Sequence, residues 1–431
     1  MVASVQTLPA AWAREKKRLQ TYTRRVPEST SLYQIVSAGR EKLQQCWELL
    51  FEHKYGALRQ EVPGALDKFL ECGVLAYGCA HAECTNPACN HSETIAFSCK
   101  RRCLCPSCDA KRAVIFAENL EHEVLLKLPH QHGIMTLPKR IRPFFKFRRS
   151  LLGLLYRCAW EAWQACVAEK CPQGKSGAVM ALHTAGDLLA WHCHLHIIFL
   201  TGALLPGGVF MPLEINPQKL QECFADKVLS ALLKEELLTQ EIVDSMKSWP
   251  HSGFSAFLGE PIAADDTKQR LFVARYLKKC PISNERLCLT TQNGDTVVTL
   301  TAVRNGKTNL RTFSVLEFLA ELQQHLPDTF EQTSRFFGIY SSRSRGAEKE
   351  KSAPISAPYL PDASAKPSPK WAALMKRVFE IDPLLCPRCG AQMKIKSFVT
   401  DPRQIQRLLL NLGLPSATAP PPLSVTIPEA A

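Results

Sequence analysis

Residues 191–200 read WHCHLHIIFL, in which histidine occupies alternate positions before an apolar run. This alternation predicts a β-strand, because side chains at positions i and i+2 share one face of a strand and each residue advances about 3.3 Å. His194 and His196 would then lie side by side and could hold one divalent cation. His192, His194 and His196 together span roughly 13 Å at this rise and could hardly serve a single ion.

A further histidine, His183, precedes this strand and is separated from it by a short turn. Residues 179–183 and 189–200 predict two strands joined near Gly186, which favours a hairpin. A hairpin would bring His183 beside the histidine pair as a candidate third ligand. The equally weighted alternative is a strand-end histidine that hydrogen-bonds locally. Imidazole ligands suit Mn²⁺, and Mg²⁺ is tolerated where water completes the coordination shell.

Composition restricts the class of protein. The 53 basic residues outnumber the 40 acidic ones in this 431-residue chain, and the formal charge of +13 favours a polyanionic partner, nucleic acid first. We find no signal-like apolar segment and no apolar run long enough to cross a bilayer, so we expect no membrane association. We expect a cytoplasmic, nucleoid-associated prokaryotic protein. Several of its 18 cysteines form closely spaced pairs, which in a reducing compartment indicate zinc rather than disulfides.

The strongest zinc signal lies between residues 84 and 108. Cys84 and Cys89 form one pair, and Cys105 and Cys108 form another after fifteen intervening residues. Two such pairs separated by a short hairpin predict one tetrahedral structural zinc site. Cys99 is an alternative ligand. Other nearby side chains could also replace one of the four ligands or help to form a second site: Cys103, Cys79, His81 and His91.

Two further features of the cysteine-rich regions carry predictions. Lys100, Arg101 and Arg102 make this ribbon basic, which suits contact with a DNA backbone, although a ribbon that only braces the fold is the alternative. Near the C-terminus, Cys386 and Cys389 form half of a second zinc site. That pair could borrow ligands, pair with a partner subunit or be a buried turn.

Residues 266–279 predict a helix that carries a candidate nucleophile, Tyr276. A phenol has a pKa near 10 and attacks poorly at neutral pH, but a cation that polarises a phosphate lowers the nucleophilicity required. Arg275, Lys278 and Lys279 can favour the phenolate and grip neighbouring DNA phosphates. Phe272 shares the helical face of Tyr276 but has no hydroxyl group.

With these residues identified, the chain resembles the insertion-sequence-91 family of rolling-circle transposases, which are HUH endonucleases. The resemblance covers roughly residues 31–414. It rests on an ordered set of short segments: FSCK at 97–100, CPSC at 105–108, MTLPKR at 135–140, LHT at 182–184, HLH at 194–196, ARY at 274–276, PIS at 281–283, RL at 286–287 and FEIDP at 379–383.

The resemblance implies an α+β fold with an HUH-type central antiparallel sheet, flanking helices, an N-terminal helical and zinc-ribbon module, and a small C-terminal CxxC module. It also implies DNA transposition and recombination: nicking of single-stranded element ends, a 5′-phosphotyrosine link at Tyr276, and strand transfer to target DNA. Mg²⁺ or Mn²⁺ would be the catalytic cation and Zn²⁺ the structural one. Phe272 stands where many members have a second tyrosine, so the chain matches the single-tyrosine branch, and a second subunit of a homo-oligomer could supply another tyrosine.

These considerations give an expected organisation and two competing functions. We expect a basic flexible arm at 1–30, a helical and zinc-ribbon DNA-binding domain at 31–120, the nuclease domain at 121–340, a linker at 341–370, the CxxC module at 371–414 and a disordered tail at 415–431. One alternative function is a catalytically inactive DNA-binding protein, either a degraded transposase or a regulator. The other is a zinc hydrolase that uses water as its nucleophile.

Overall fold

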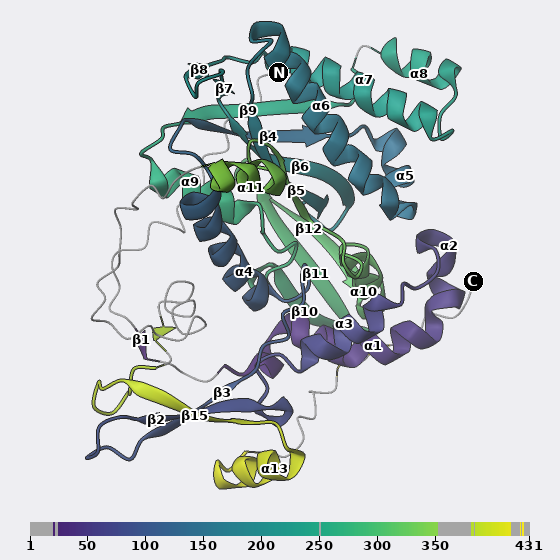
Figure 1. The fold of residues 1–431 in the computed structure, drawn as a ribbon. Helices are drawn as coiled ribbons and strands as arrows, with labels where there is room; N and C mark the ends of the chain where they lie inside the picture. The colour runs from purple at the N-terminus through teal and green to yellow at the C-terminus, as the bar shows by residue number, and fades with distance from the viewer. Residues whose placement is uncertain are drawn as a thin grey trace. The chain divides into compact units, whose positions relative to one another are not determined.

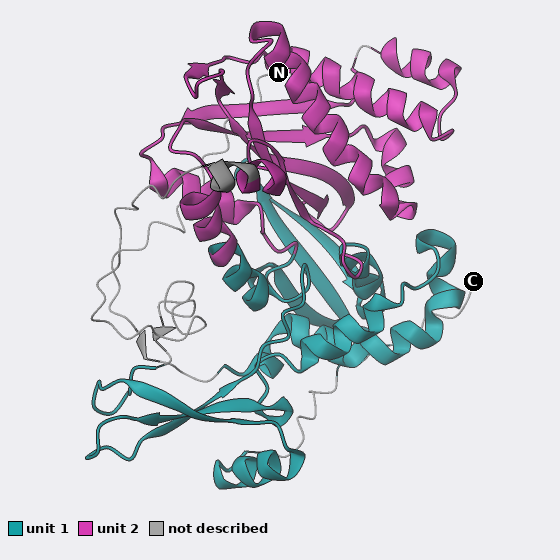
Figure 2. Cartoon of the chain, viewed as in Figure 1, with its two compact units in different colours: residues 1–114, 282–326, 363–431 teal, residues 115–281, 327–362 magenta. Residues whose placement is uncertain are grey.

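Two compact units make up the chain, each assembled from segments that are far apart in the sequence. The computed structural model describes residues 20–21, 25–249, 251–351, 381–382 and 384–414, with the isolated positions 423 and 425 (Figure 1). Unit 1 comprises residues 1–114, 282–326 and 363–431, and unit 2 comprises residues 115–281 and 327–362 (Figure 2). The expected nuclease domain at 121–340 is thus interrupted, because residues 282–326 belong to unit 1.

A five-stranded sheet forms the centre of unit 2. Its strands run in the order β13-β5-β6-β4-β9, and every neighbouring pair is antiparallel. The mixed α+β class with an antiparallel sheet is therefore confirmed, as is the predicted hairpin, which is formed by β5 and β6. The strands are β4 (His130–Thr136), β5 (Gly177–Ala185), β6 (Trp191–Leu200), β9 (Ser255–Ile262) and β13 (Ser334–Gly338).

Alternate residues of β6 enter two different cores. Leu195, Ile197 and Phe199 belong to the core under four helices, and Ile198 and Leu200 belong to the core on the opposite face. His194 and His196 share the parity of Ile198 and Leu200, so they face the second core. The helices over the first core are α5 (Arg142–Phe147), α6 (Leu152–Lys170), α7 (Pro217–Lys234) and α8 (Gln240–Lys247).

Helix α9 (Thr267–Tyr276) covers the histidine-bearing face of the sheet. Asp266 caps its N-terminus by accepting a hydrogen bond from the backbone N–H of Gln269 at 2.9 Å. Arg270, within the helix, is buried and donates to the Glu121 carboxylate at 2.7 Å and to the Leu126 carbonyl at 3.1 Å. These contacts fix α9 to the segment Leu120–Val124, which follows α4 (Pro106–Asn119).

Unit 1 pairs a helical layer with a second antiparallel sheet, β10-β11-β12. The Asn305-Gly306 turn joins β11 to β12 as predicted, and both residues have positive φ angles, 52° and 73°, which this type of tight hairpin requires. Helix α1 packs against α10, with Gly39 at the closest approach. The elements are α1 (Ser31–Leu50), α2 (Glu52–Tyr55), α3 (Glu61–Leu70), β10 (Leu287–Gln292), β11 (Asp295–Arg304), β12 (Lys307–Ser314) and α10 (Val315–Gln323).

A three-stranded ribbon in unit 1 joins sequence segments about 300 residues apart. β2 (Cys79–Cys84) lies between β3 (Ser92–Ala96) and β15 (Met393–Val399), and both pairings are antiparallel. Helix α13 (Pro402–Asn411) buries Ile405 and Leu409 against Leu75 and Cys79. Of the C-terminal module expected at 371–414, β15 completes this ribbon beside β2 and α13 packs against its start, so residues 393–411 do not form a separate module. Residues 371–380 and 383 lie outside the described residues.

The remaining elements are short. Two-stranded pairings join β7 (Gly202–Leu204) to β8 (Phe210–Pro212) and β1 (Gln20–Thr21) to β14 (Ile381–Asp382). Helix α11 (Ser342–Lys351) occupies the start of the expected linker. Most of the expected arm, the rest of the linker and most of the expected tail lie outside the described residues.

Candidate metal centres and nucleophile

Three histidines meet on one face of the unit 2 sheet. The register of the β5–β6 hairpin sets His183 directly opposite His194, and His196 lies two positions further along the same face. One potential ligand nitrogen from each ring lies within 4.8 Å of the others. The structure thus brings together the predicted pair and the candidate third ligand, in a spacing that one cation could bridge.

The second nitrogen of each ring already has a hydrogen-bond partner. His183 Nε2 lies 3.2 Å from the Leu277 carbonyl oxygen, and His194 Nδ1 lies 2.7 Å from the His192 carbonyl oxygen. A neutral imidazole that donates through one nitrogen presents a lone pair on the other. Burial lowers the pKa of His183 to about 3 and also lowers the pKa values of His194 and His196. The rings are therefore uncharged at neutral pH, as metal ligands must be.

His132 completes this arrangement and was missed from the sequence. Its Nε2 lies 3.2 Å from His196 Nδ1, and the two rings stack with an interplanar angle of 10°. Burial lowers the pKa of His132 to about 4, so the ring can accept a hydrogen bond from His196. The signal that could have found it is the His130-Gln131-His132 alternation, which repeats on β4 the pattern of β6.

Tyr276 is the last residue of α9 and lies against the histidine cluster. Its ring centroid is 4.8 Å from that of His196 and 6.1 Å from that of His183. Burial, followed by the charge of Asp187, raises the pKa of the phenol. Phe272, one turn earlier, packs against the second core. The structure therefore positions one tyrosine, and no second hydroxyl from this helix, beside the candidate metal site.

The three basic residues that flank Tyr276 have different environments. Arg275 Nε is buried and has no hydrogen-bond partner among the described residues. The ammonium group of Lys279 lies 5.1 Å from the centre of the Tyr276 ring. Lys278 instead donates to Ser334 Oγ at 2.9 Å and to Thr333 Oγ1 at 3.3 Å. Arg275 and Lys279 are thus better placed than Lys278 to meet an anion at the tyrosine.

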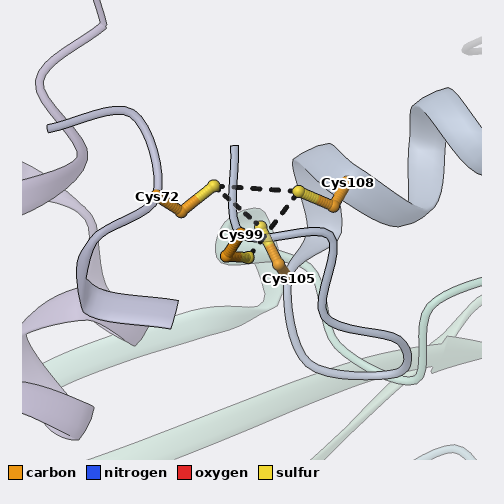
Figure 3. Close-up of side chains that lie close together, drawn as sticks. All are labelled: Cys72, Cys99, Cys105 and Cys108. Carbon is orange, nitrogen blue, oxygen red and sulfur yellow. Dashed lines mark hydrogen bonds between the residues drawn. The ribbon is translucent and has the colours of Figure 1, made fainter. Parts of the chain in front are cut away.

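Four cysteine side chains converge on one point in unit 1 (Figure 3). Cys72 Sγ lies 3.6 Å from Cys105 Sγ and 3.7 Å from Cys108 Sγ, and Cys99 Sγ lies 3.7 Å from Cys108 Sγ. Contact with Cys105, then with Cys108, lowers the pKa of Cys72. Four such sulfurs are the donor set of a closed structural zinc site.

The loop that carries Cys99 and Cys105 is held by its own polar contacts. The backbone N–H of Cys103 donates to buried Asp109 Oδ2 at 2.7 Å, and Arg112 pairs with the same carboxylate. Arg112 also donates to the Lys100 carbonyl oxygen at 2.7 Å. The predicted DNA-contacting side chains of Lys100 and Arg101 are exposed on this loop, and that of Arg102 is half-buried.

A second cluster contains Cys84, Cys89, Cys386 and Cys389. The single site that we expected from Cys84, Cys89, Cys105 and Cys108 is therefore wrong, because the two pairs belong to different clusters. Strand pairing of β15 with β2 brings the C-terminal pair to Cys84 and Cys89. Cys99, the alternative ligand, joins the other cluster. Cys72 was missed because a lone cysteine after a helix has no informative spacing.

Comparisons with known proteins agree with this division of sites. A family model described as a transposase zinc-binding domain matches residues 42–137, and one described as "Putative transposase" matches residues 177–348. The first match contains six of the clustered cysteines and the second contains the three clustered histidines with Tyr276. The zinc-binding match and the cysteine clusters together support structural Zn²⁺.

Two curated relatives extend the comparison along the chain. The transposase for insertion sequence element IS801 of Pseudomonas savastanoi pv. phaseolicola is 30% identical over 81% of this chain and 86% of its own length. "Putative transposase y4qJ" of Sinorhizobium fredii is 26% identical over 64% of this chain and 73% of its own length. No solved structure matches significantly. Within the described residues, no helix is long and apolar enough to cross a membrane. By its similarity to these proteins, the chain belongs to the insertion-sequence-91 family of transposases.

Proposed function

We propose that this chain is a metal-dependent HUH tyrosine transposase, which nicks and joins single-stranded DNA during rolling-circle transposition. What supports this mechanism most directly is the position of Tyr276, whose ring lies 4.8 Å from that of His196 and beside two further histidines. A tyrosine ring beside the neutral imidazoles of His196 and His183 unites a candidate nucleophile with candidate ligands for a cation. A buried tyrosine with a purely structural role would need no such neighbours.

The proposed reaction is a transesterification. The Tyr276 oxygen attacks the scissile phosphorus, the bond from phosphorus to the 3′ oxygen breaks, and the phenol proton is formally transferred to that leaving oxygen. The products are a 5′-phosphotyrosine and a free 3′ hydroxyl. Mn²⁺ or Mg²⁺, held by His183, His194 and His196, would polarise the phosphate and offset its developing charge. Since all three protein donors are nitrogens, we expect Mn²⁺ to bind more tightly than Mg²⁺.

The surroundings of Tyr276 suit an anionic substrate. Because burial raises the pKa of the phenol, it carries its proton at neutral pH before substrate binds. The Lys279 ammonium above the ring favours the phenolate, and the unpaired Arg275 Nε offers a donor to a phosphate oxygen. Rejoining would follow the reverse path, with a 3′ hydroxyl attacking the phosphotyrosine. Two simultaneous 5′ links would need a second subunit.

Zinc-bearing unit 1 is the proposed DNA-binding part. Its exposed Lys100 and Arg101 lie on the loop between two cysteines of the first cluster, where fixed geometry would present their charges to phosphates. The net charge of +13 supports the same partner. We propose single-stranded element ends and target DNA as its ligands.

The covalent intermediate provides the test. Purified full-length protein would be incubated with labelled single-stranded oligonucleotides that carry the two ends of the encoding element, with Mn²⁺ or Mg²⁺, and resolved on a denaturing gel. We expect an adduct that mass spectrometry maps to Tyr276. Tyr276→Phe should bind DNA without forming it, whereas Tyr77→Phe, which alters an exposed tyrosine of unit 1, should behave as the unsubstituted protein.

Other outcomes would each contradict the mechanism in a distinct way. Metal-dependent cleavage without an adduct would indicate hydrolysis by water. Binding without cleavage on either end would favour a non-catalytic DNA-binding protein. Full cleavage by Tyr276→Phe would exclude this residue as the nucleophile.

A further inference from the structure

We propose that Cys84, Cys89, Cys386 and Cys389 form a second zinc site, which fastens the C-terminal segment 384–399 to the zinc-binding domain. The matched zinc-binding domain ends at residue 137, so it includes only half of this cluster. Cys84 Sγ lies 3.5 Å from Cys389 Sγ, and Cys89 Sγ lies 3.8 Å from Cys386 Sγ. Each contact therefore joins one N-terminal and one C-terminal cysteine.

Each of the four sulfurs has a backbone N–H donor from a residue two or three positions further along the chain. The backbone N–H of Asn86 favours the thiolate of Cys84, and that of His91 favours the thiolate of Cys89. The N–H groups of Cys389 and then Arg388 act in the same sense on Cys386, and that of Ala391 on Cys389. Such donors stabilise a thiolate and fix its direction. An incidental cluster of thiols has no reason to have such a donor at every sulfur.

The turn after Cys386 has a closed backbone geometry. The N–H of Cys386 donates to the Ala391 carbonyl at 2.8 Å, and the N–H of Gly390 donates to the Cys386 carbonyl at 2.9 Å. Gly390 has a φ of +71°, which a side chain would disfavour. The turn therefore directs both C-terminal sulfurs to the same side, as a chelating pair requires.

Contacts beyond the sulfurs hold the two halves in register but bury little apolar surface. Met393 pairs with Cys84 in the β15–β2 ladder, and the backbone N–H and side-chain hydroxyl of Thr85 both donate to the Gln392 carbonyl, at 3.0 and 2.8 Å. Among the described residues, the buried members of the core beneath them are Ala82, Ile95, Leu384, Cys386 and Met393. So small a core gains much of its stability from a bound metal.

Zinc is the occupant that these donors favour. The sulfur separations of 3.5 and 3.8 Å are far longer than the roughly 2.05 Å of a disulfide, but they suit sulfurs that share one ion. Four thiolates select zinc or an iron–sulfur cluster. The experiment therefore measures iron and sulfide as well as zinc.

The test counts metal in the full-length chain, purified with zinc and a reducing agent. A His194→Ala/His196→Ala background removes binding at the histidine cluster, so the remaining zinc belongs to cysteine sites. We expect two zinc ions per chain, in line with the two cysteine clusters. Cys84→Ser/Cys89→Ser and Cys386→Ser/Cys389→Ser should each lose one, and all four substitutions together should still lose only one.

The matched controls separate this site from its neighbours. Cys288→Ser, at an exposed cysteine outside both clusters, should retain both ions. Cys389→His should retain the second ion, because imidazole is also a zinc ligand. The proposal fails if Cys386→Ser/Cys389→Ser keeps two ions, if the fourfold variant loses both, or if the purified chain holds iron and sulfide there.

A second measurement addresses the fastening itself. In Cys84→Ser/Cys89→Ser, we expect the amides of β15 to exchange with solvent at least tenfold faster, although β15 lies about 300 residues away in sequence. Amides of β11, in the other unit 1 sheet, should keep their protection. Unchanged exchange in β15 after loss of the ion would show that the metal does not hold the segment. Neither readout depends on DNA cleavage, so this proposal can fail while the proposed function stands.

Discussion

His132→Phe should weaken metal binding without removing a metal ligand. In the structure, His132 Nε2 is the partner of His196 Nδ1 at 3.2 Å, which leaves His196 Nε2 as the ligand nitrogen. Phenylalanine retains the stacked ring but cannot accept the hydrogen bond. Loss of a partner of this kind typically costs about 10–100-fold in metal affinity or activity. That range corresponds to about 1.4–2.8 kcal/mol of binding free energy.

Manganese affinity would be measured directly, from the electron paramagnetic resonance signal of free Mn²⁺ in a titration of the full-length protein. Single-turnover formation of the DNA adduct at increasing Mn²⁺ concentrations would give the kinetic counterpart. We expect the His132→Phe midpoint to rise by about 10–100-fold, with recovery of the rate at saturating metal. The manganese midpoint of His132→Gln should lie between those of the unsubstituted protein and His132→Phe, because the glutamine amide oxygen can accept the same hydrogen bond.

His130 supplies the matched control, because it lies on the same strand and face as His132. It is fully buried and is hydrogen-bonded at 2.7 Å to Tyr340. His130→Gln should therefore lower stability yet leave the manganese midpoint unchanged. An unchanged midpoint in His132→Phe, or an equal shift in both variants, would refute a specific role for the His132–His196 contact.

Three further perturbations follow from other parts of the structure. The rate of adduct formation should rise with pH between about 6 and 9, because burial raises the pKa of Tyr276 and the reactive phenolate becomes more abundant toward high pH. Rates that stay flat or fall across a stopped-flow pH series would contradict this prediction. Glu121→Gln should reduce the free energy of unfolding by about 3–5 kcal/mol in urea titrations, because it leaves Arg270 buried without its carboxylate. Lys127 and Arg270 lower the pKa of Glu121 despite its burial. The stability that the ionised carboxylate contributes should therefore be lost as the pH falls through the native pKa of Glu121. An unchanged urea midpoint for Glu121→Gln at neutral pH would exclude the pair as a stabilising contact. Gly39→Ala should lower the free energy of unfolding by about 1–3 kcal/mol in thermal denaturation, because the added Cβ would lie 2.6 Å from Leu319 Cδ1. An unaltered Tm would mean that α1 and α10 pack less closely than described.

The sequence predicted the histidine face of unit 2 because its signal is local. Strand periodicity alone puts His194 and His196 on one face, and a short turn leaves little choice of register for His183. The Asn305-Gly306 turn is a similar case, since its positive φ angles are encoded in two adjacent residues. The position of Tyr276 could not be predicted from local sequence alone, because a helix does not specify the sheet on which it packs.

The cysteines could not be grouped correctly because their grouping depends on long-range pairing. Between Cys72 and Cys108, spacing alone favours joining the two nearest pairs into one site. The structure instead divides them, because β15 pairs with β2 and carries Cys386 and Cys389 to the tip of the ribbon. Sequence spacing can identify a chelating pair, but it cannot identify which other pair shares the metal.

The same principle connects the proposed sites. A metal ligand on a strand is precise only when neighbouring strands and hydrogen bonds fix its ring, and His132 on β4 serves His196 on β6 in this way. A cysteine pair on a loop has no flanking strands to hold it, so a segment from elsewhere in the chain completes each cluster, with Cys72 in the first and Cys386 and Cys389 in the second. The histidine centre can therefore keep ligand positions open for a phosphate, whereas four sulfurs close each cysteine centre. This difference in support and in donor number is what we expect if unit 2 carries the proposed chemistry and the cysteine centres of unit 1 carry structural zinc.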